Sequence, residues 1–170
     1  MITMDNDLNN RVKGMVLGQF LGDAASLGVH WIYNTQEIER LHPEGLQGFE
    51  EPAEGHYHAG KLAGDLTHYG DAAWVLLEAL AGETTFNVAT FGTAFVEKMD
   101  PGKGYSGYFD SASRGTLENF RNHHEVSNQP YGFQEGADDD QLATISVLAV
   151  LIAFYVARNG GLPEDRTTLM

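Results

Sequence analysis

The chain has 170 residues, enough for one domain with a sizeable core, and 42% of them are hydrophobic, as is usual in globular proteins. It contains no cysteine, which excludes disulfides, cysteine-ligated zinc and iron–sulfur clusters. Its formal net charge of −14 disfavours nucleic-acid and anionic-membrane partners.

The N-terminus lacks the basic and apolar regions of a signal peptide. The apolar run from Leu142 to Ala157 is shorter than the roughly 20 residues that a membrane-spanning helix needs. We therefore expect a cytoplasmic protein without a membrane partner.

The first predicted helix covers about residues 8–28. Val12, Val16 and Phe20 recur at the spacing of one helix face. A second row at this spacing consists of glycines: Gly14, Gly18 and Gly22. This row predicts a smooth edge on which another backbone packs closely.

The stretch over residues 33–70 is predicted to be irregular apart from a short helix at TQEIERL, with Thr35 as its N-cap. Apolar periodicity and end signals predict later helices over about 71–80, 86–99, 111–120 and 138–158, and a further helix opening at 162–165. No period-two alternation indicates a strand. The predicted fold class is all-α, with residues 1–170 in a single all-α domain.

The segment GDLTHYGDAAW, residues 64–74, places polar side chains before an apolar helical pattern. In one interpretation Asp71 only caps the helix that follows. In the other, Asp71 with Thr67 or His68 faces a cleft and holds a cation or a sugar hydroxyl. Both interpretations stay open at this point.

The segment GQFLGDAASLGVHWIY, residues 18–33, places Asp23 inside an otherwise apolar helix, where an acid needs a partner or a cleft. His30 and Trp31 follow at the expected helix end. A single histidine is more often a hydrogen-bonded core or rim residue than a ligand. His30 beside Asp23 nevertheless suggests an acid or base near neutral pH.

Two other clusters give weaker signals. His56 and His58 form an i, i+2 pair in a glycine-rich loop and could bind a transition metal adventitiously. The acidic run 138–140 is compatible with solvation and helix capping, or with a hard divalent metal.

At these residues the sequence resembles the ADP-ribosylglycohydrolase family. GMVLGQFLGDAASLG matches the family's opening Gly-x-x-x-Gly-x-x-x-Gly-Asp-Ala pattern, and DAAWVLLEAL lies where the family carries its first metal motif, Thr-Asp-Asp-Thr. HWIY at 30–33, THYGD at 67–71 and YSGYFDSASRGTLENF at 105–120 are similar to the branch containing jellyfish J crystallins and a selenoprotein relative.

The resemblance implies a multi-helix all-α bundle with two divalent cations, usually Mg²⁺, that hydrolyses a glycosidic bond of ADP-ribose. On this alignment the first metal motif becomes Tyr69-Gly70-Asp71-Ala72, so only Asp71 keeps a ligand side chain. A glutamate that the family often carries falls near His30. Because the second metal motif, Asp-x-Asp-Thr, lies far toward the C-terminus in the family, we expect this chain to be the N-terminal portion of a domain truncated at its C-terminus.

The resulting prediction is an ADP-ribosylglycohydrolase-like hydrolase with an altered metal site, acting on ADP-ribose or a related nucleoside or sugar conjugate. Its predicted catalytic residues are Asp23, His30 and Asp71, which should converge on one pocket. Its predicted substrate-binding residues are Trp31, His68 and Tyr69. Asp71 is the candidate Mg²⁺ ligand.

The alternative is a non-catalytic, crystallin-like structural or ligand-binding relative, or an inactive fragment. The expected partner is a small molecule or an ADP-ribosylated substrate, and no nucleic acid. We also expect a homo-oligomer, because a truncated domain leaves the uncharged helix over 142–157 without its partner.

Overall fold

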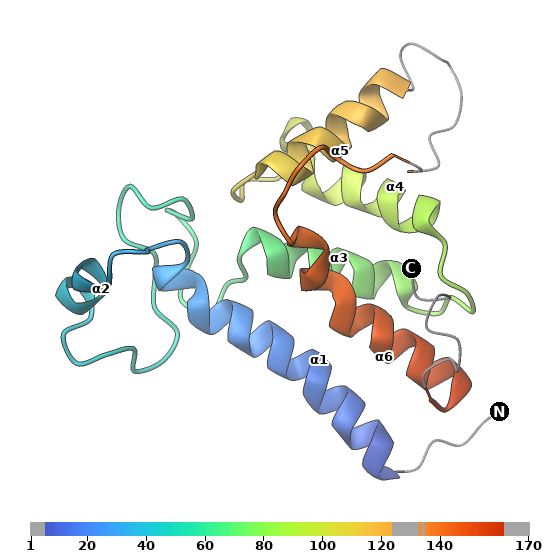
Figure 1. Cartoon of the computed structure of the whole chain (residues 1–170), viewed down its shortest axis with the longest axis horizontal. Helices are drawn as coiled ribbons and strands as arrows, with labels where there is room; N and C mark the ends of the chain where they lie inside the picture. Colours follow the sequence, from blue (N-terminus) through green and yellow to red (C-terminus); the bar gives the residue numbers. More distant parts are fainter. Residues whose placement is uncertain (1–5, 124–132, 134, 162–170) are drawn as a thin grey trace.

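The computed structural model describes residues 6–123, 133 and 135–161 (Figure 1). These residues form six α-helices and no strand, which confirms the all-α fold class. The α-helices are α1 (Asn6–Ser26), α2 (Thr35–Leu41), α3 (His68–Leu80), α4 (Val88–Met99), α5 (Ser111–Asn122) and α6 (Leu148–Asn159). The described residues also form three short 3₁₀ helices: η1 (Leu27–Val29), η2 (Pro101–Lys103) and η4 (Ala143–Val147). Over the described part of the chain, every helix falls short of the length and apolarity of a membrane span.

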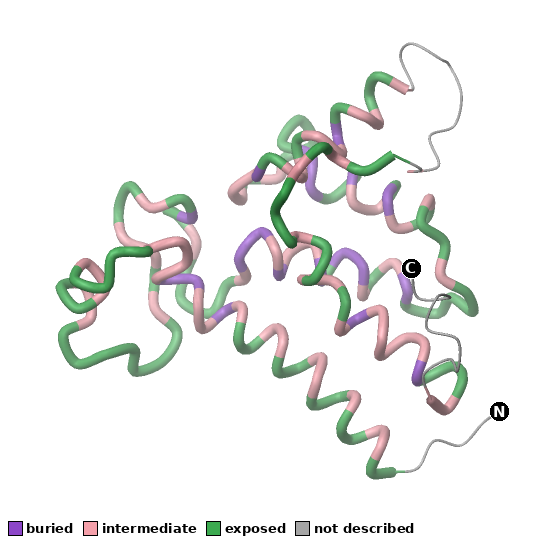
Figure 2. Tube along the Cα trace, viewed as in Figure 1, coloured by how far each residue is buried: buried purple, intermediate pink, exposed green. Residues whose placement is uncertain are grey.

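Helix α3 occupies the centre of the fold, with α4 on one side and α1 and α6 on the other (Figure 1). Its apolar residues Ala73, Leu76 and Leu80 recur at helical spacing and are buried together with Val150 of α6 (Figure 2). Because α3 is covered on both sides, its first turn is held firmly against its neighbours.

Helix α3 begins at His68 rather than near Asp71. Thr67 is extended and is the N-cap, and its Oγ1 accepts a hydrogen bond of 3.2 Å from Tyr69 N. Asp71 lies inside the helix, where its N–H donates to Thr67 O at 2.9 Å. The interpretation of Asp71 as the cap is therefore wrong, since Thr67 satisfies the first free donors.

The helix predicted over 138–158 begins later than expected. Residues 138–142 are not helical, η4 follows, and α6 starts only at Leu148. Asp139 instead accepts a hydrogen bond of 2.8 Å from Gln141 N and another from the Ser111 hydroxyl. A side chain that bonds its own backbone in this way competes with helix formation. Gly160, in the left-handed conformation with φ 70°, ends α6 as predicted, whereas the helix expected at 162–165 lies outside the described residues.

The glycine row of α1 does not receive another backbone. A Cβ added at Gly14, Gly18 or Gly22 would meet nothing within 4 Å among the described residues, so the expected close packing is wrong there. The reason is the orientation of α1, which packs against α6 and turns Phe20 toward the core. The glycine edge and Leu17, which is 61% exposed, remain uncovered in this structure.

The stretch between α2 and α3 is irregular, as predicted, and folds beside the end of α1 (Figure 1). Asn34, not Thr35, caps α2, because its Oδ1 accepts from Gln36 N at 3.0 Å. A close approach requires glycine at Gly28, where a Cβ would lie 2.7 Å from Glu50 Cβ. This contact helps to place the loop over the start of α3.

Candidate functional site

Asp23 connects α1 to the start of α3. Its Oδ1 accepts a hydrogen bond of 2.6 Å from Thr67 Oγ1, and its Oδ2 accepts one of 2.7 Å from Thr67 N. Burial raises the pKa of Asp23, and this effect exceeds the lowering by the hydrogen bonds from Thr67. The acid inside the helix therefore has a partner, as its position demanded, and both of its oxygens are occupied.

Gly70 makes this connection sterically feasible. A Cβ at position 70 would overlap Asp23 Oδ2, lie 2.7 Å from Asp23 Cγ, and lie 2.9 Å from Leu66 Cβ. Only a residue without a side chain lets the carboxylate lie against this turn of α3. The sequence interpretation treated Gly70 as a lost metal ligand and missed this steric role.

The charge of Asp71 is compensated inside the chain. Lys61 Nζ lies 2.6 Å from Asp71 Oδ2, and Tyr105 Oη donates to the same oxygen at 2.7 Å. Lys61 also donates to Leu66 O at 2.6 Å, which fixes its ammonium group. Burial, and then the charge of Asp71, raise the pKa of Tyr105. Sequence reasoning missed both Lys61 and Tyr105.

The residues around Asp71 do not fit a Mg²⁺ site. Mg²⁺ requires an octahedral set of oxygen ligands. An ammonium group already lies against Asp71 Oδ2, and Tyr69, Gly70 and Ala72 provide no carboxylate. The nearby carboxylate of Asp23 is used by Thr67. Lys61 thus supplies the positive charge that a metal would otherwise bring.

Replacing Lys61 by methionine should lower the free energy of unfolding by about 2 kcal/mol, because a partly buried carboxylate loses a charge-assisted hydrogen bond. Urea unfolding at neutral pH measures the loss. The matched control is Arg40→Met, which breaks a solvent-exposed pair with Glu37 and should change stability much less than Lys61→Met. Equal losses of stability in the two variants would contradict the role of Lys61 as the cation that compensates the charge of Asp71.

A second group gathers three histidines from separate segments. His30 follows η1, His58 lies in the irregular stretch, and His68 is the first residue of α3. One ring nitrogen of each lies within 4.8 Å of the others. His58 and His68 are both 2% exposed. Asp110, the N-cap of α5, places Oδ2 3.3 Å from His68 Nε2.

The predicted substrate-binding residues lie in this group. Trp31 packs 4.9 Å from the ring of His30 and 5.2 Å from that of His68, and Tyr69 lies 5.7 Å from His30 (ring centroids). Sequence reasoning therefore identified His30, Trp31, His68 and Tyr69 as neighbours, while their binding role stays a prediction. It gave His58 only an adventitious role, and it considered Asp110 or Ser111 as a helix cap without connecting Asp110 to His68.

His56 holds the group in place. Its Nε2 lies 2.6 Å from His30 O, and its Nδ1 accepts a hydrogen bond of 3.1 Å from His58 N. His56 and His58, which form the i, i+2 pair, thus have different structural roles. His56 fixes backbone positions, and His58 contributes its ring to the buried cluster.

Without a bound metal ion, the histidine cluster makes the free energy of unfolding sensitive to acid. Burial, and then neighbouring imidazoles, lower the pKa of His30 to about 4 and that of His58 to about 3. In the unfolded chain both titrate near pH 6.5. Between these values the unfolded chain binds the protons and the folded chain does not, so acidification favours unfolding.

We expect the free energy of unfolding to be highest above about pH 6.5 and to fall as the pH approaches 4. Urea unfolding in the presence of a chelator, at a series of pH values, measures this slope. The double variant His30→Asn, His58→Asn should flatten it, while His56, His68, Lys61 and Asp110 remain. A variant with the wild-type slope would show that other groups are responsible.

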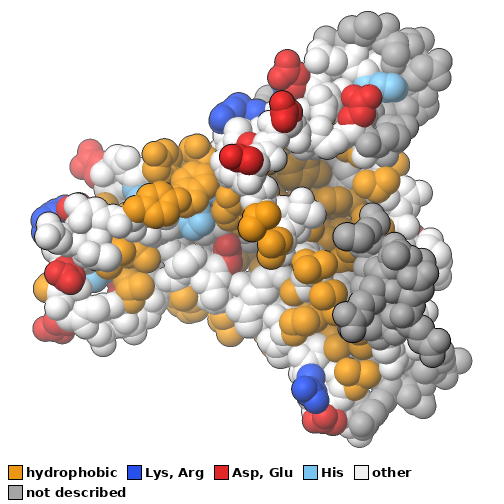
Figure 3. Space-filling view, viewed as in Figure 1, with side chains coloured by type: hydrophobic (Ala, Val, Ile, Leu, Met, Phe, Trp, Pro, Cys, Tyr) orange, Lys and Arg blue, Asp and Glu red, His pale blue; other side chains and the backbone are white. Residues whose placement is uncertain are grey.

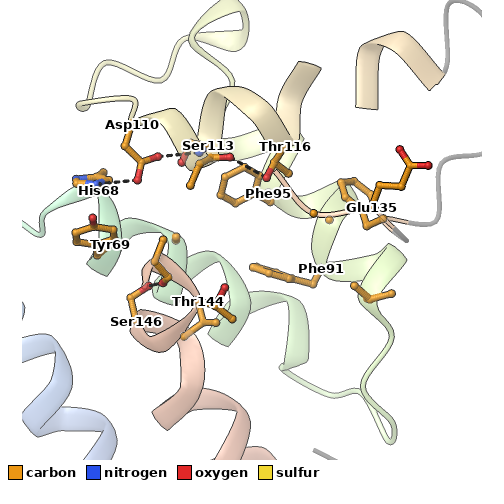
Figure 4. A pocket seen from close by; sticks show the side chains of 18 residues that line it. His68, Tyr69, Phe91, Phe95, Asp110, Ser113, Thr116, Glu135, Thr144 and Ser146 are labelled. Carbon is orange, nitrogen blue, oxygen red and sulfur yellow. Dashed lines mark hydrogen bonds and ion pairs between the residues drawn. The ribbon is translucent and has the colours of Figure 1, made fainter. Parts of the chain in front are cut away.

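An apolar cavity of about 240 Å³ lies between α3, α4, α5 and η4 (Figure 4). His68 and Asp110 lie at one end of it, and Phe91 and Phe95 form apolar walls. Hydroxyl groups project from the facing elements: Tyr69, Ser113, Thr116, Thr144 and Ser146. Among the residues that the structure describes, 18 line the cavity, and they include Asp110 and Glu135 but no lysine or arginine.

The structure does not place Asp23, His30 and Asp71 in one pocket. Asp23 borders a cavity with Tyr69 and Gly70, whereas Asp71 borders a different one with Lys61. His30 belongs to the histidine cluster. The expected convergence is therefore not found, and the catalytic roles of the three residues stay predictions.

The chain is similar in sequence to known proteins. A family model described as ADP-ribosylglycohydrolase matches residues 4–166. Crystallin J1A and crystallin J1B of Tripedalia cystophora are each 25% identical to the chain over 160 residues. The matches cover 86% and 87% of this chain, respectively, and 47% of each relative, so the chain spans about half the length of the curated relatives it matches. No solved structure matches significantly.

Proposed function

The chain belongs to the ADP-ribosylglycohydrolase family, and we propose that it binds a neutral sugar or nucleoside without Mg²⁺-dependent hydrolysis at Asp71. The observation that carries the proposal is the contact of 2.6 Å between Lys61 Nζ and Asp71 Oδ2. An internal cation there replaces a bound metal. The similarity to two proteins named crystallins is compatible with a non-catalytic role.

The cavity between α3 and α5 supports a neutral ligand. Its aromatic walls suit the face of a base or sugar ring, and its hydroxyl groups suit sugar oxygens. Asp110 and Glu135 line it, its lining within the described part of the chain includes no lysine or arginine, and the chain has a net charge of −14. This electrostatic environment disfavours a pyrophosphate and favours an uncharged glycoside.

Isothermal titration calorimetry with adenosine, ribose, ADP-ribose and Mg²⁺ tests the proposal. We expect binding of a neutral compound, weaker binding of ADP-ribose, and no saturable Mg²⁺ binding. Thr144→Val, which removes a cavity hydroxyl, should weaken binding, and Thr93→Val on the exposed face of α4 should not. Tight Mg²⁺ binding that Asp71→Asn abolishes would contradict the proposal.

A hydrolase with an altered site is the second candidate, and the raised pKa of Asp23 favours it. Asp23 borders a cavity with Tyr69, and glycosidases use a carboxylic acid whose pKa is raised by burial. ADP-ribosylated arginine and serine substrates, with and without Mg²⁺, test this candidate. Turnover that Asp23→Asn abolishes would support it, and no turnover at high enzyme concentration would exclude it.

We propose further that the chain self-associates in the cytoplasm. Hydrophobic side chains gather over the region of η4 and α6 (Figure 3). Leu142, just before η4, is 76% exposed, and Ile145 of η4 is 58% exposed. The net charge supports neither nucleic acid nor an anionic membrane as partner. Light scattering should show a dimer or larger species that Ile145→Ser weakens, and a monodisperse monomer would contradict the proposal.

A further inference from the structure

We propose that His30, His58 and His68 form a binding site for a divalent transition metal, with Zn²⁺ as the best-fitting ion. This site is separate from the Asp71 position. Three imidazole nitrogens drawn from three chain segments lie within 4.8 Å of one another. Imidazole is the ligand that Zn²⁺, Cu²⁺ and Ni²⁺ share, and three histidines with an open fourth position are a known zinc arrangement.

Unpaired polar atoms inside the cluster point to a ligand. His30 Nε2 and both ring nitrogens of His58 and of His68 are buried and have no hydrogen-bond partner among the described residues. Buried polar groups in proteins are nearly always satisfied, because leaving one unpaired destabilises the fold. A metal ion would satisfy one nitrogen of each ring.

Asp110 supplies the contact that orients a metal-binding histidine. Its Oδ2 lies 3.3 Å from His68 Nε2, an ion-pair contact without hydrogen-bond geometry, and a metal would take the other ring nitrogen, Nδ1. Carboxylate, histidine and zinc are commonly arranged in this order, because the carboxylate fixes the ring and strengthens the ligand. Ser113 N donates to the other oxygen of Asp110 at 2.8 Å, so the carboxylate is itself held.

The backbone next to His30 is held in an uncommon conformation. Trp31 has φ of 63°, the left-handed region that bulky residues rarely occupy. Its ring packs against Tyr57 at 5.3 Å and against Tyr108 at 5.0 Å (centroids). Local strain of this kind concentrates at ligand sites, because the surrounding packing must maintain it. Here the packing keeps His30 beside the other two rings.

The three rings can reach the spacing of a bound zinc ion by small movements toward one another. Nitrogens bound to tetrahedral zinc at about 2.0–2.1 Å lie roughly 3.3 Å apart. The three rings must therefore close slightly from their present separation of up to 4.8 Å. His68 and Asp110 also line the cavity of about 240 Å³, so the site adjoins a space for a ligand (Figure 4).

Metal titration of the chelator-treated wild-type chain tests the proposal directly. Calorimetry with Zn²⁺ should give one saturable site per chain, and Co²⁺ should give the intense visible absorption of a tetrahedral centre. X-ray absorption of the zinc-loaded chain should show imidazole scattering from three histidines. These measurements use unmutated protein, so they do not depend on the folding of any variant.

Substitutions then assign the ligands. His30→Gln, His58→Gln and His68→Gln should each abolish stoichiometric binding, and circular dichroism checks that each variant folds. Asp110→Asn keeps the α5 cap but loses the carboxylate charge, and it should weaken Zn²⁺ binding by about 10–100-fold. The matched control, His42→Gln at the end of α2, should leave binding unchanged.

Several outcomes would overturn the proposal. Absorption spectra showing only oxygen ligands, or the absence of saturable Zn²⁺ and Co²⁺ binding by the wild-type chain, would show that the cluster is merely packed aromatic rings. Equal loss of binding in His42→Gln would indicate adventitious surface binding. Mg²⁺ prefers oxygen ligands to imidazole. Absence of Zn²⁺ binding at the histidines is therefore distinguishable from Mg²⁺ binding at Asp71, which would contradict the proposed function.

Discussion

Replacing Asp23 by alanine should lower the free energy of unfolding by about 2–4 kcal/mol. The substitution removes both acceptors for Thr67, whose N–H and hydroxyl are then buried without partners, and Thr67 is 0% exposed. It also releases α1 from the first turn of α3. Urea unfolding followed by circular dichroism measures the loss.

A second variant at this position separates the loss of the negative charge from the loss of the acceptor oxygens, and a surface variant is the control. Asp23→Asn keeps one acceptor oxygen but presents an NH₂ group where Oδ2 accepts from Thr67 N, so its effect should be intermediate. Asp7→Ala, on the exposed start of α1, is the matched control and should change stability by less than about 0.5 kcal/mol. An Asp23→Ala variant as stable as this control would show that the link between α1 and α3 is not needed for folding.

The sequence predicted that Asp23 needs a partner but not which partner it has. An acid within an apolar helical pattern must be satisfied, and this argument is local. Thr67 lies 44 residues away, so its position depends on how α3 packs against α1. The same limit applies to Asp71, whose partner Tyr105 lies 34 residues further along the chain.

Helix positions followed well from apolar periodicity, because α3 and α4 bury residues at helical spacing. The start of α6 did not, since Asp139 bonds Gln141 N instead of starting a helix. The glycine row of α1 was also misjudged. Spacing shows that glycines share a face, but only packing shows whether anything lies against that face.

The histidine cluster was predictable in part. His30 and His68 belong to short segments that already stood out by composition. His58 comes from a stretch without regular secondary structure, where no periodicity indicates the direction of a side chain. Its burial becomes visible only once the loop packs over the start of α3.

Replacing Gly70 by alanine should lower the free energy of unfolding by about 1–3 kcal/mol, although alanine is the better helix former. The added methyl group would overlap Asp23 Oδ2 and press on Leu66 Cβ at 2.9 Å. Gly18→Ala in α1 is the matched control. It meets nothing within 4 Å and should stabilise the chain by about 0.5–1 kcal/mol.

A double-mutant cycle between Asp23→Ala and Gly70→Ala tests whether the two positions act through one contact. Removing the Asp23 carboxylate creates the space that the methyl group of alanine needs, so Gly70→Ala should cost much less in the Asp23→Ala background. Additive losses would mean that the strain arises at Leu66 instead. A coupling between the two would show that glycine at this turn of α3 serves the packing of the Asp23 carboxylate against it.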